Sequence, residues 1–321
     1  MRRFIGIFEK HSAALIVFGL VVAFGSTSTG TFATGSNIEN IARQISLDAP
    51  MVFGQAVVLI AGGIDISVGS TMAMAAAIAI GLQPYGTLTA VAAALLFGLA
   101  VGVVNGLLVT RGRIVAFVAT LGTMSVVRGL LLTYTGQRSL SGQDPAFAWW
   151  GGGQIGPVPV SLLVVLALLG VLWVFLGHTR EGRALYAIGG SKDAAFLGGV
   201  SVDRGLMVAF SISGALAAVS GVLVASRLNS ASVQLGADAP LMSISAALIG
   251  GASLLGGKGG IIGAFFGVLA LGILNNGMNL LGVPTYSQIA IRAMILIAIV
   301  AIDALGTALR RRDLAQGRIT Q

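Results

Sequence analysis

The sequence of 321 residues contains no cysteine, and only 9% of its residues are charged. The absence of cysteine excludes disulfides and thiolate metal sites. Soluble domains carry about 25% charged residues. The shortage of charge here, with 56% hydrophobic residues and a mean hydropathy of +0.95, therefore excludes an ordinary water-soluble fold. The composition predicts a protein that is embedded in a lipid bilayer.

Residues for catalysis and nucleotide binding are also scarce. Neither His11 nor His178 has neighbours in the pattern of a catalytic triad or a metal site. The nearest match to a phosphate-binding loop has Ala252 in place of its first glycine and Gly259 in place of the Ser or Thr that holds magnesium. We therefore expect no enzyme activity, no catalytic or metal-binding residues and no cofactor on this chain.

The charge that is present is mostly positive, with 19 Lys and Arg against 11 Asp and Glu. A nucleic-acid partner would need a basic patch on a soluble face, whereas these basic residues stand at the ends of apolar segments. If the N-terminus is cytoplasmic, fourteen of the 19 lie inside, two outside and three within spans, as the positive-inside rule requires. The pattern excludes nucleic acid and predicts that both termini are cytoplasmic.

Long apolar runs divide the chain into candidate membrane spans. A hydrocarbon core about 30 Å thick needs about 20 apolar residues per helix. Two of the ten runs, 67–82 and 239–256, are short enough to be half-helices, which would leave eight or nine full crossings. The sequence predicts an all-α, polytopic membrane protein in a single domain, residues 1–321, with spans near 12–26, 38–62, 67–82, 87–110, 114–135, 158–177, 204–226, 239–256, 260–282 and 286–309.

Glycine is abundant, with 47 residues. Small residues let membrane helices approach closely, and Gly98, Gly102 and Gly106 form one ridge of this kind. The glycine pairs 62–63 and 250–251 each precede a span that ends in a cluster of Gly and Asn. This similarity suggests that the chain has two related halves, as many transporters have.

A lone carboxylate interrupts the apolar sequence at Asp65, followed by Ser67. An ionised Asp at mid-bilayer costs about 2.5–3.5 kcal/mol on insertion scales, so it is paired, hydrated or functional. Asp65 or Ser67 could cap the next helix, or either could contact a solute, because broken helices in transporters serve both purposes. The sequence leaves both interpretations open.

Amides and guanidinium groups also stand inside apolar spans. The amides can bond hydroxyl groups of a solute or a neighbouring helix. Arg128 and Arg292 can snorkel or pair with a carboxylate such as Asp303. The residues that we predict to border or support a solute path are Asp65, Ser67, Asn105, Asn275, Asn276 and Asn279.

Several motifs, spread over nearly the whole chain, together resemble one family. They are the segments 62–70 (GGIDISVGS), 105–109 (NGLLV), 117–124 (FVATLGTM), 182–190 (GRALYAIGG), 250–259 (GGASLLGGKG) and 274–277 (LNNG). The chain is similar to permease subunits of ribose-type monosaccharide ABC importers, a group that also resembles branched-chain amino-acid permeases.

The resemblance implies a permease in the bacterial inner membrane that works with separate partners. These are cytoplasmic subunits that bind ATP and magnesium, a periplasmic solute-binding protein, and a second permease copy in a homodimer or heterodimer. It also implies that residues 181–200 form a cytoplasmic coupling segment that docks on the ATPase. The candidate coupling residues are Glu181, Arg183, Tyr186, Ala187, Ile188, Gly189 and Phe196.

Other functions remain open at this stage. An ion-coupled secondary transporter would have a similar number of helices but more ionisable residues within its spans. A structural or sensory membrane protein would need no transport path. The segment 181–200 could also lie on anionic lipid as an amphipathic connector. Within the importer interpretation, the low charge favours a neutral sugar or polyol, although a branched-chain amino acid or a nucleoside is not excluded.

Overall fold

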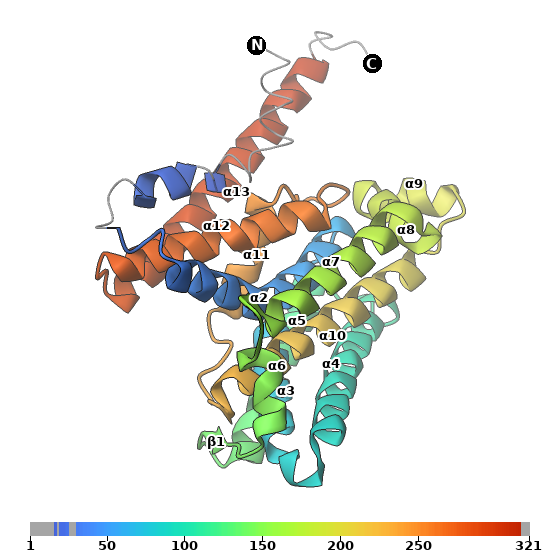
Figure 1. Ribbon diagram of the computed structural model, residues 1–321. Helices are drawn as coiled ribbons and strands as arrows, with labels where there is room; N and C mark the ends of the chain where they lie inside the picture. The colour runs from blue at the N-terminus through green and yellow to red at the C-terminus, as the bar shows by residue number, and fades with distance from the viewer. Residues whose placement is uncertain (1–15, 18, 26–29, 316–321) are drawn as a thin grey trace.

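The computed structural model describes residues 16–17, 19–25 and 30–315, without the side chains of residues 299 and 302–315. Helices make up most of this part of the chain (Figure 1). They are α2 (Gly35–Ile60), α3 (Val68–Gly81), η1 (Gln83–Tyr85), α4 (Thr87–Thr110), α5 (Ala116–Thr135), α6 (Pro145–Gly152), α7 (Val160–His178), α8 (Arg180–Gly190), α9 (Lys192–Leu197), α10 (Val202–Leu228), α11 (Ala239–Ile249), α12 (Ile261–Leu280) and α13 (Thr285–Ala315).

The predicted all-α membrane fold is confirmed. Among the described residues, five helices are long and apolar enough to cross a membrane: α4, α5, α7, α10 and α12. The two short runs form helices of only 14 and 11 residues, α3 and α11, each too short to span the bilayer alone. The predicted span at 12–26 is described only at residues 16–17 and 19–25, which are helical.

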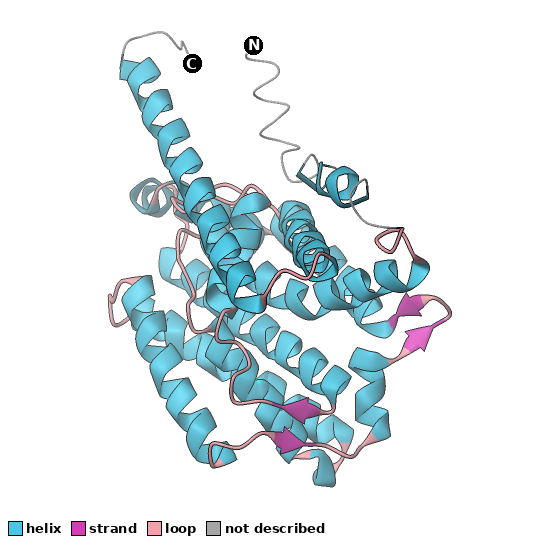
Figure 2. Cartoon of the chain, turned by 90° about the vertical axis from the view of Figure 1, so that its left-hand side faces the viewer, coloured by secondary structure: helices cyan, strands magenta, loops and turns pink. Residues whose placement is uncertain are grey.

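Two short antiparallel strand pairs were not predicted (Figure 2). Strand β1 (Leu140–Ser141) pairs with β4 (Ser230–Ala231), and β2 (Gln154–Ile155) pairs with β3 (Val158–Pro159). Both pairs lie in connections between helices, where two residues per strand give no alternating pattern for a sequence to display. The pair of β1 and β4 ties the connection after α5 to the connection after α10, whereas β2 and β3 form a local hairpin between α6 and α7.

Helix α10 lies at the centre of the structure and packs against α2, α3, α4 and α6. The predicted glycine ridge explains the close approach of α4. A methyl group on Gly98 would lie 2.4 Å from the carbonyl oxygen of Gly214, and one on Gly102 would lie 2.3 Å from that of Phe210. Only glycine permits this backbone contact, which is how membrane helices gain dispersion energy without a hydrophobic drive.

Candidate functional site

Helices α2 and α11 each end in a turn of the same backbone type. At the end of α2, Gly62 has φ +77°, its N–H donates to Leu59 O at 2.9 Å, and Gly63 N–H donates to Val58 O at 2.9 Å. At the end of α11, Gly251 has φ +88°, with equivalent bonds to Leu248 and from the next residue to Ala247. Both are Schellman turns, which need glycine at the left-handed position. The structure aligns Gly62 with Gly251, one residue later than the glycine pairs suggest.

The buried carboxylate of Asp65 holds the broken segment between α2 and α3. Its Oδ1 accepts from Ser67 N at 2.9 Å and from Ser67 Oγ at 2.6 Å, and its Oδ2 accepts from Ser213 Oγ of α10 at 2.8 Å. Asn105 of α4 donates from Nδ2 to Ser67 Oγ at 2.8 Å. Asp65 and Asn105 are fully buried, so these bonds replace water around the carboxylate. The network joins the break to two long helices.

Thr120 of α5 supports the same segment. Its Oγ1 accepts from Ile66 N at 3.2 Å, and its proton has Ala116 O of its own helix at 2.9 Å and Ile64 O at 3.3 Å as acceptors. Sequence reasoning did not single out Thr120 or Ser213 as site residues, because a hydroxyl in an apolar helix can equally bond its own backbone. The only available signal was the place of Thr120 in the 117–124 motif.

The three asparagines at the end of α12 have different environments. Asn276 and Asn37 of α2 exchange hydrogen bonds of 2.7 and 3.0 Å between their amides. Asn279 accepts from Gln288 of α13 at 2.8 Å. Asn275 is buried, and its Oδ1 has no partner among the described residues. Of the predicted path residues, Asp65, Ser67 and Asn105 come together, whereas these asparagines lie at a separate helix contact.

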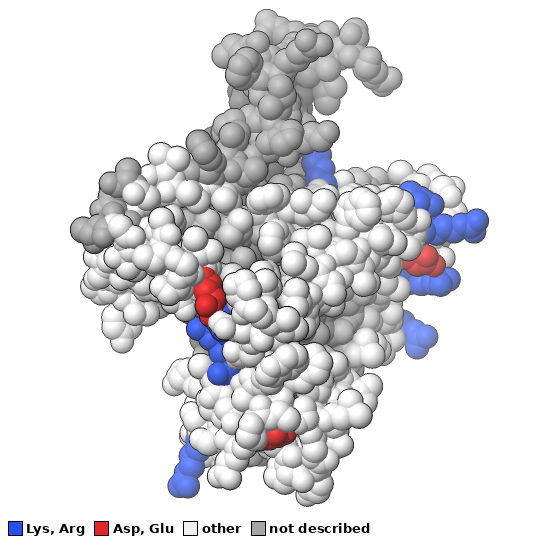
Figure 3. Space-filling model, in the orientation of Figure 1, with Lys and Arg blue, Asp and Glu red and all other residues white. Residues whose placement is uncertain are grey.

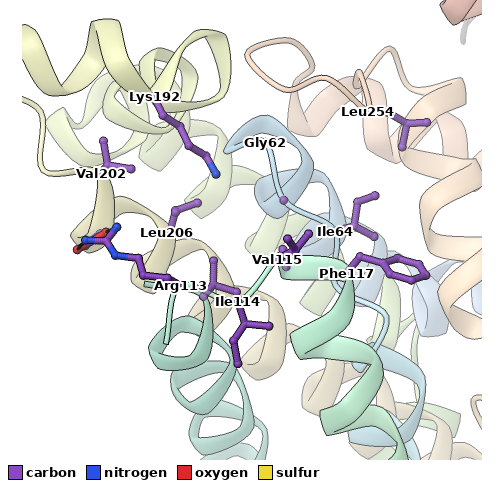
Figure 4. Close-up of a pocket in the computed structure, with 14 residues that line it drawn as sticks. Gly62, Ile64, Arg113, Ile114, Val115, Phe117, Lys192, Val202, Leu206 and Leu254 are labelled. Carbon is purple, nitrogen blue, oxygen red and sulfur yellow. Dashed lines mark hydrogen bonds and ion pairs between the residues drawn. The ribbon is translucent and has the colours of Figure 1, made fainter. Parts of the chain in front are cut away.

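A cavity of about 390 Å³ opens beside the broken segment (Figure 4). It lies between the turn at Gly62, the start of α5 near Phe117, and the start of α10. Lys192 points toward it from α9, and Arg113 at its edge pairs with Asp203 at 3.3 Å. The break and the predicted coupling segment therefore face one shared space.

The predicted coupling segment forms two short helices, α8 and α9, joined at Ser191. Figure 3 shows the basic side chains gathered over this end of the molecule, with an acidic group among them. Ile188 is 1% exposed, whereas Phe196 is 71% exposed. The side chain of Glu181 is 45% exposed and pairs with Arg204 at 3.3 Å. Arg183 and Ala187 are exposed.

The end of α8 touches the backbone of two other segments. A methyl group on Gly189 would lie 1.9 Å from Ile60 O and 2.4 Å from Gly257 N. Gly257 N–H also donates to Ile60 O at 2.9 Å. One turn earlier, Tyr186 Oη donates to Gly259 O at 3.1 Å. Burial raises the pKa of Tyr186 above its ordinary value, so the phenol keeps the proton that this bond requires.

The arginines within spans find partners other than Asp303. Arg128 donates to Leu235 O at 3.1 Å, and Arg292 lies 3.9 Å from a carboxylate oxygen of Asp238. The side chain of Asp303 lies outside the described residues. Asp48, in the middle of α2, is a carboxylate that the sequence reasoning passed over.

Comparison with known proteins gives a consistent result. The family described as branched-chain amino acid transport system / permease component matches residues 37–300. The ribose import permease protein RbsC of Escherichia coli (strain K12) is 38% identical over 302 residues, covering 92% of this chain and 93% of that protein. The D-allose transport system permease protein AlsC of the same organism is 36% identical and covers 92% of each chain.

More distant relatives keep nearly full-length coverage. The galactose/methyl galactoside import permease protein MglC of Escherichia coli (strain K12) is 31% identical, covering 92% of this chain and 94% of that protein. No solved structure matches the chain.

Proposed function

The chain belongs to the branched-chain amino acid transport permease family, and from that membership we propose that it is the membrane permease of an ATP-driven importer for a neutral monosaccharide. The observation that carries the proposal is 31–38% identity over nearly the whole chain to permeases named for ribose, allose and galactose. The confirmed polytopic helical fold agrees with this function.

The sugar is proposed to cross the membrane through this chain while other subunits bind ATP and magnesium. The chain's nearest match to a nucleotide loop lacks its first glycine and its magnesium ligand. The remaining proposed partners are a solute-binding protein outside the cell and a second permease copy. The proposed membrane is the bacterial inner membrane, with both termini in the cytoplasm.

We propose that α8 and α9 dock on the ATPase. The exposed residues Glu181, Arg183, Ala187 and Phe196 supply the contact, with charge at the rim and an aromatic side chain in a groove. Ile188 and Gly189 hold the segment on the permease instead, because the buried Ile188 packs against Gly205 and the half-buried Gly189 packs against Ile60.

The polar residues of the break have a supporting part in this proposal. Asp65, Ser67 and Asn105 fix the start of α3 beside the 390 Å³ cavity, which lets the chain leave helical geometry inside the membrane without unpaired backbone groups. Asn276 and Asn279 hold α12 against α2 and α13, whereas the buried Asn275 has no such bond among the described residues.

Reconstitution tests the function directly. The permease, its ATPase and its binding protein are placed in liposomes, and uptake of labelled ribose, allose, xylose and galactose is measured with and without ATP. We expect uptake of at least one sugar that needs ATP and all three proteins. Uptake by the permease alone, driven by an ion gradient, would refute the proposal and favour a secondary transporter.

Crosslinking tests the docking surface. The chain has no native cysteine, so a cysteine at Ala187 or Phe196 is unique. Each should crosslink to a cysteine in the groove of the ATPase in an active complex. A cysteine at Ala167, which is exposed on the apolar helix α7, is the matched control and should not. Equal crosslinking at all three positions would exclude α8 and α9 as the specific contact.

A further inference from the structure

Asp48 lies in the middle of α2, within the segment 38–62 that the sequence predicts as a membrane span. It is the fourteenth residue of the 26-residue helix α2, so it lies about 20 Å along a helix of about 39 Å. A carboxylate at this depth faces water, a partner charge or a functional cavity. Asp48 is partly exposed, and it lines a hollow of about 280 Å³.

The lining of this hollow combines polar and apolar groups. Met51 of α2 and Met72 of α3 are buried within it, at 1% and 4% exposure. The connector between β4 and α11 supplies one wall, where Gln234 and Asp238 are exposed. An apolar floor with a few polar groups is typical of small-molecule sites, and 280 Å³ lies just below their usual volumes of about 300–1,000 Å³.

Buried polar groups without partners among the described residues lie on the same two helices, α2 and α3. Gln55 follows Asp48 and Met51 at helical spacing, so the three share one face of α2. Both amide atoms of Gln55 are buried without a hydrogen-bond partner among the described residues, and so is Oγ1 of Thr71, the neighbour of Met72. Buried groups without partners are rare in folded proteins. A polar solute that passes between α2 and α3 would pair with them.

The position of the hollow also fits a transport site. The connector that forms its wall reaches back to the start of α3, where a methyl group on Gly69 would lie 2.2 Å from Gly236 O. The chain therefore runs without helical structure against the start of the short apolar helix α3. Transporters place substrate sites near the bilayer midplane at such discontinuous helices, because irregular backbone is tolerated there only when buried in protein or lining a water-filled cavity.

We propose that the hollow bordered by Asp48, Met51, Met72, Gln234 and Asp238 is a solute-binding site on the translocation path, suited to a neutral, hydroxyl-rich molecule of monosaccharide size. This inference rests on the proposed import function. The Asp48 carboxylate accepts hydrogen bonds from solute hydroxyls, and the Gln234 amide both donates and accepts. Met51 and Met72 contact the apolar face of the sugar ring and close the way toward Gln55.

Cysteine labelling tests whether the hollow holds water and solute. Ala237→Cys lies in the hollow, and Ala167→Cys, exposed on α7, is the matched lipid-facing control. The full chain, with its ATPase bound, is placed in nanodiscs and treated with a charged thiosulfonate. We expect Ala237→Cys to react at least tenfold faster than the control, and ribose, allose, xylose or galactose at high concentration to slow the reaction several-fold.

Two results would overturn the assignment. Equal labelling of both cysteines would mean that the hollow faces lipid. Fast labelling that no sugar slows, together with ready disulfide formation between two copies through Ala237→Cys, would make the hollow a contact between permeases. The labelling needs neither ATP nor import, so it can fail while import succeeds, and it can succeed where the reconstituted complex imports no sugar.

Uptake by substituted complexes gives an independent measurement. Asp48→Asn keeps an acceptor oxygen and should retain at least a third of the uptake rate, whereas Asp48→Leu should lose tenfold or more while assembly with the ATPase is unchanged. Gln234→Leu should change the ratio of uptake rates among the four sugars, because this exposed residue lies where it can contact the solute without supporting the fold. Unchanged rates and ratios in all three variants would refute the site.

Discussion

Substitution of Gly189 by Ala is the sharpest test of how the coupling segment acts on the permease. Gly189 ends α8 where the backbones of Ile60 and Gly257 meet. Because Ile60 is the last residue of α2, a movement of α8 reaches the broken segment at Asp65 through main-chain atoms. No side chain in this contact can rotate away.

The structure sets the size of the effect. An added Cβ would lie 1.9 Å from Ile60 O, whereas ordinary contact begins at 3.4 Å, so the backbones must separate by about 1.5 Å. Overpacking of this kind costs about 1–3 kcal/mol, and loss of the bond from Gly257 N–H to Ile60 O costs about 1 kcal/mol more. A change of about 2 kcal/mol shifts a conformational equilibrium roughly thirtyfold.

The neighbouring residue gives a matched control. A methyl group on Gly190 meets nothing within 4 Å, so Gly190→Ala makes the same chemical change one residue later. In reconstituted complexes, we measure sugar imported per ATP hydrolysed. Gly189→Ala should lower this ratio at least tenfold while the ATPase still binds, and Gly190→Ala should leave it unchanged. Equal ratios for the two variants would show that the backbone contact does not carry the coupling.

Further substitutions in three hydrogen-bonded groups test the described hydrogen bonds. Asp65→Leu should lower the stability of the folded permease by about 2–4 kcal/mol, because the buried donors that bond Asp65 are left unpaired. Asp65→Asn should lower it by about 1–2 kcal/mol. Thermal unfolding in detergent measures both variants, and equal losses would refute the network. Tyr186→Phe should lower the stability by about 1 kcal/mol and the import per ATP several-fold, since only the bond to Gly259 is lost. Unchanged import would assign Tyr186 a packing role. Asn37→Leu and Asn276→Leu should each destabilise the protein by about 1–3 kcal/mol, and the double variant should be no worse than either, whereas additive losses would show that the amides do not act as a pair.

The long helices could be predicted from the sequence because membrane burial imposes a length and a composition on each of them. Helix α4 was expected at 87–110 and is found at Thr87–Thr110. The short helices were expected only as an alternative to full spans, since the runs 67–82 and 239–256 are close to the shortest length that crosses a bilayer core. The interruption at Asp65 was also visible, because a carboxylate between apolar runs must find donors.

The partners of these groups could not be predicted, because they depend on which helices become neighbours. Asn37 and Asn276 are 239 residues apart, and nothing in either local sequence points to the other. Ser213 and Thr120 carry small hydroxyls that are compatible with any apolar helix. Asp48 was visible as a charge but was passed over, since the first residues of the same predicted span are also polar or charged.

The contact at Gly189 marks a deeper limit of sequence reasoning. The physical event there is that three backbones touch, and glycine contributes to it only by having no side chain. A residue that acts through the absence of atoms leaves no charge, periodicity or hydrogen-bonding group for a sequence pattern to reveal. The motif 182–190 was noticed for its likeness to a family, yet its final glycines differ completely in structure: Gly189 is enclosed, and Gly190 is open. Because a methyl group on each meets such different surroundings, two adjacent glycines of one motif differ in whether they tolerate a larger side chain. Only the three-dimensional arrangement distinguishes them.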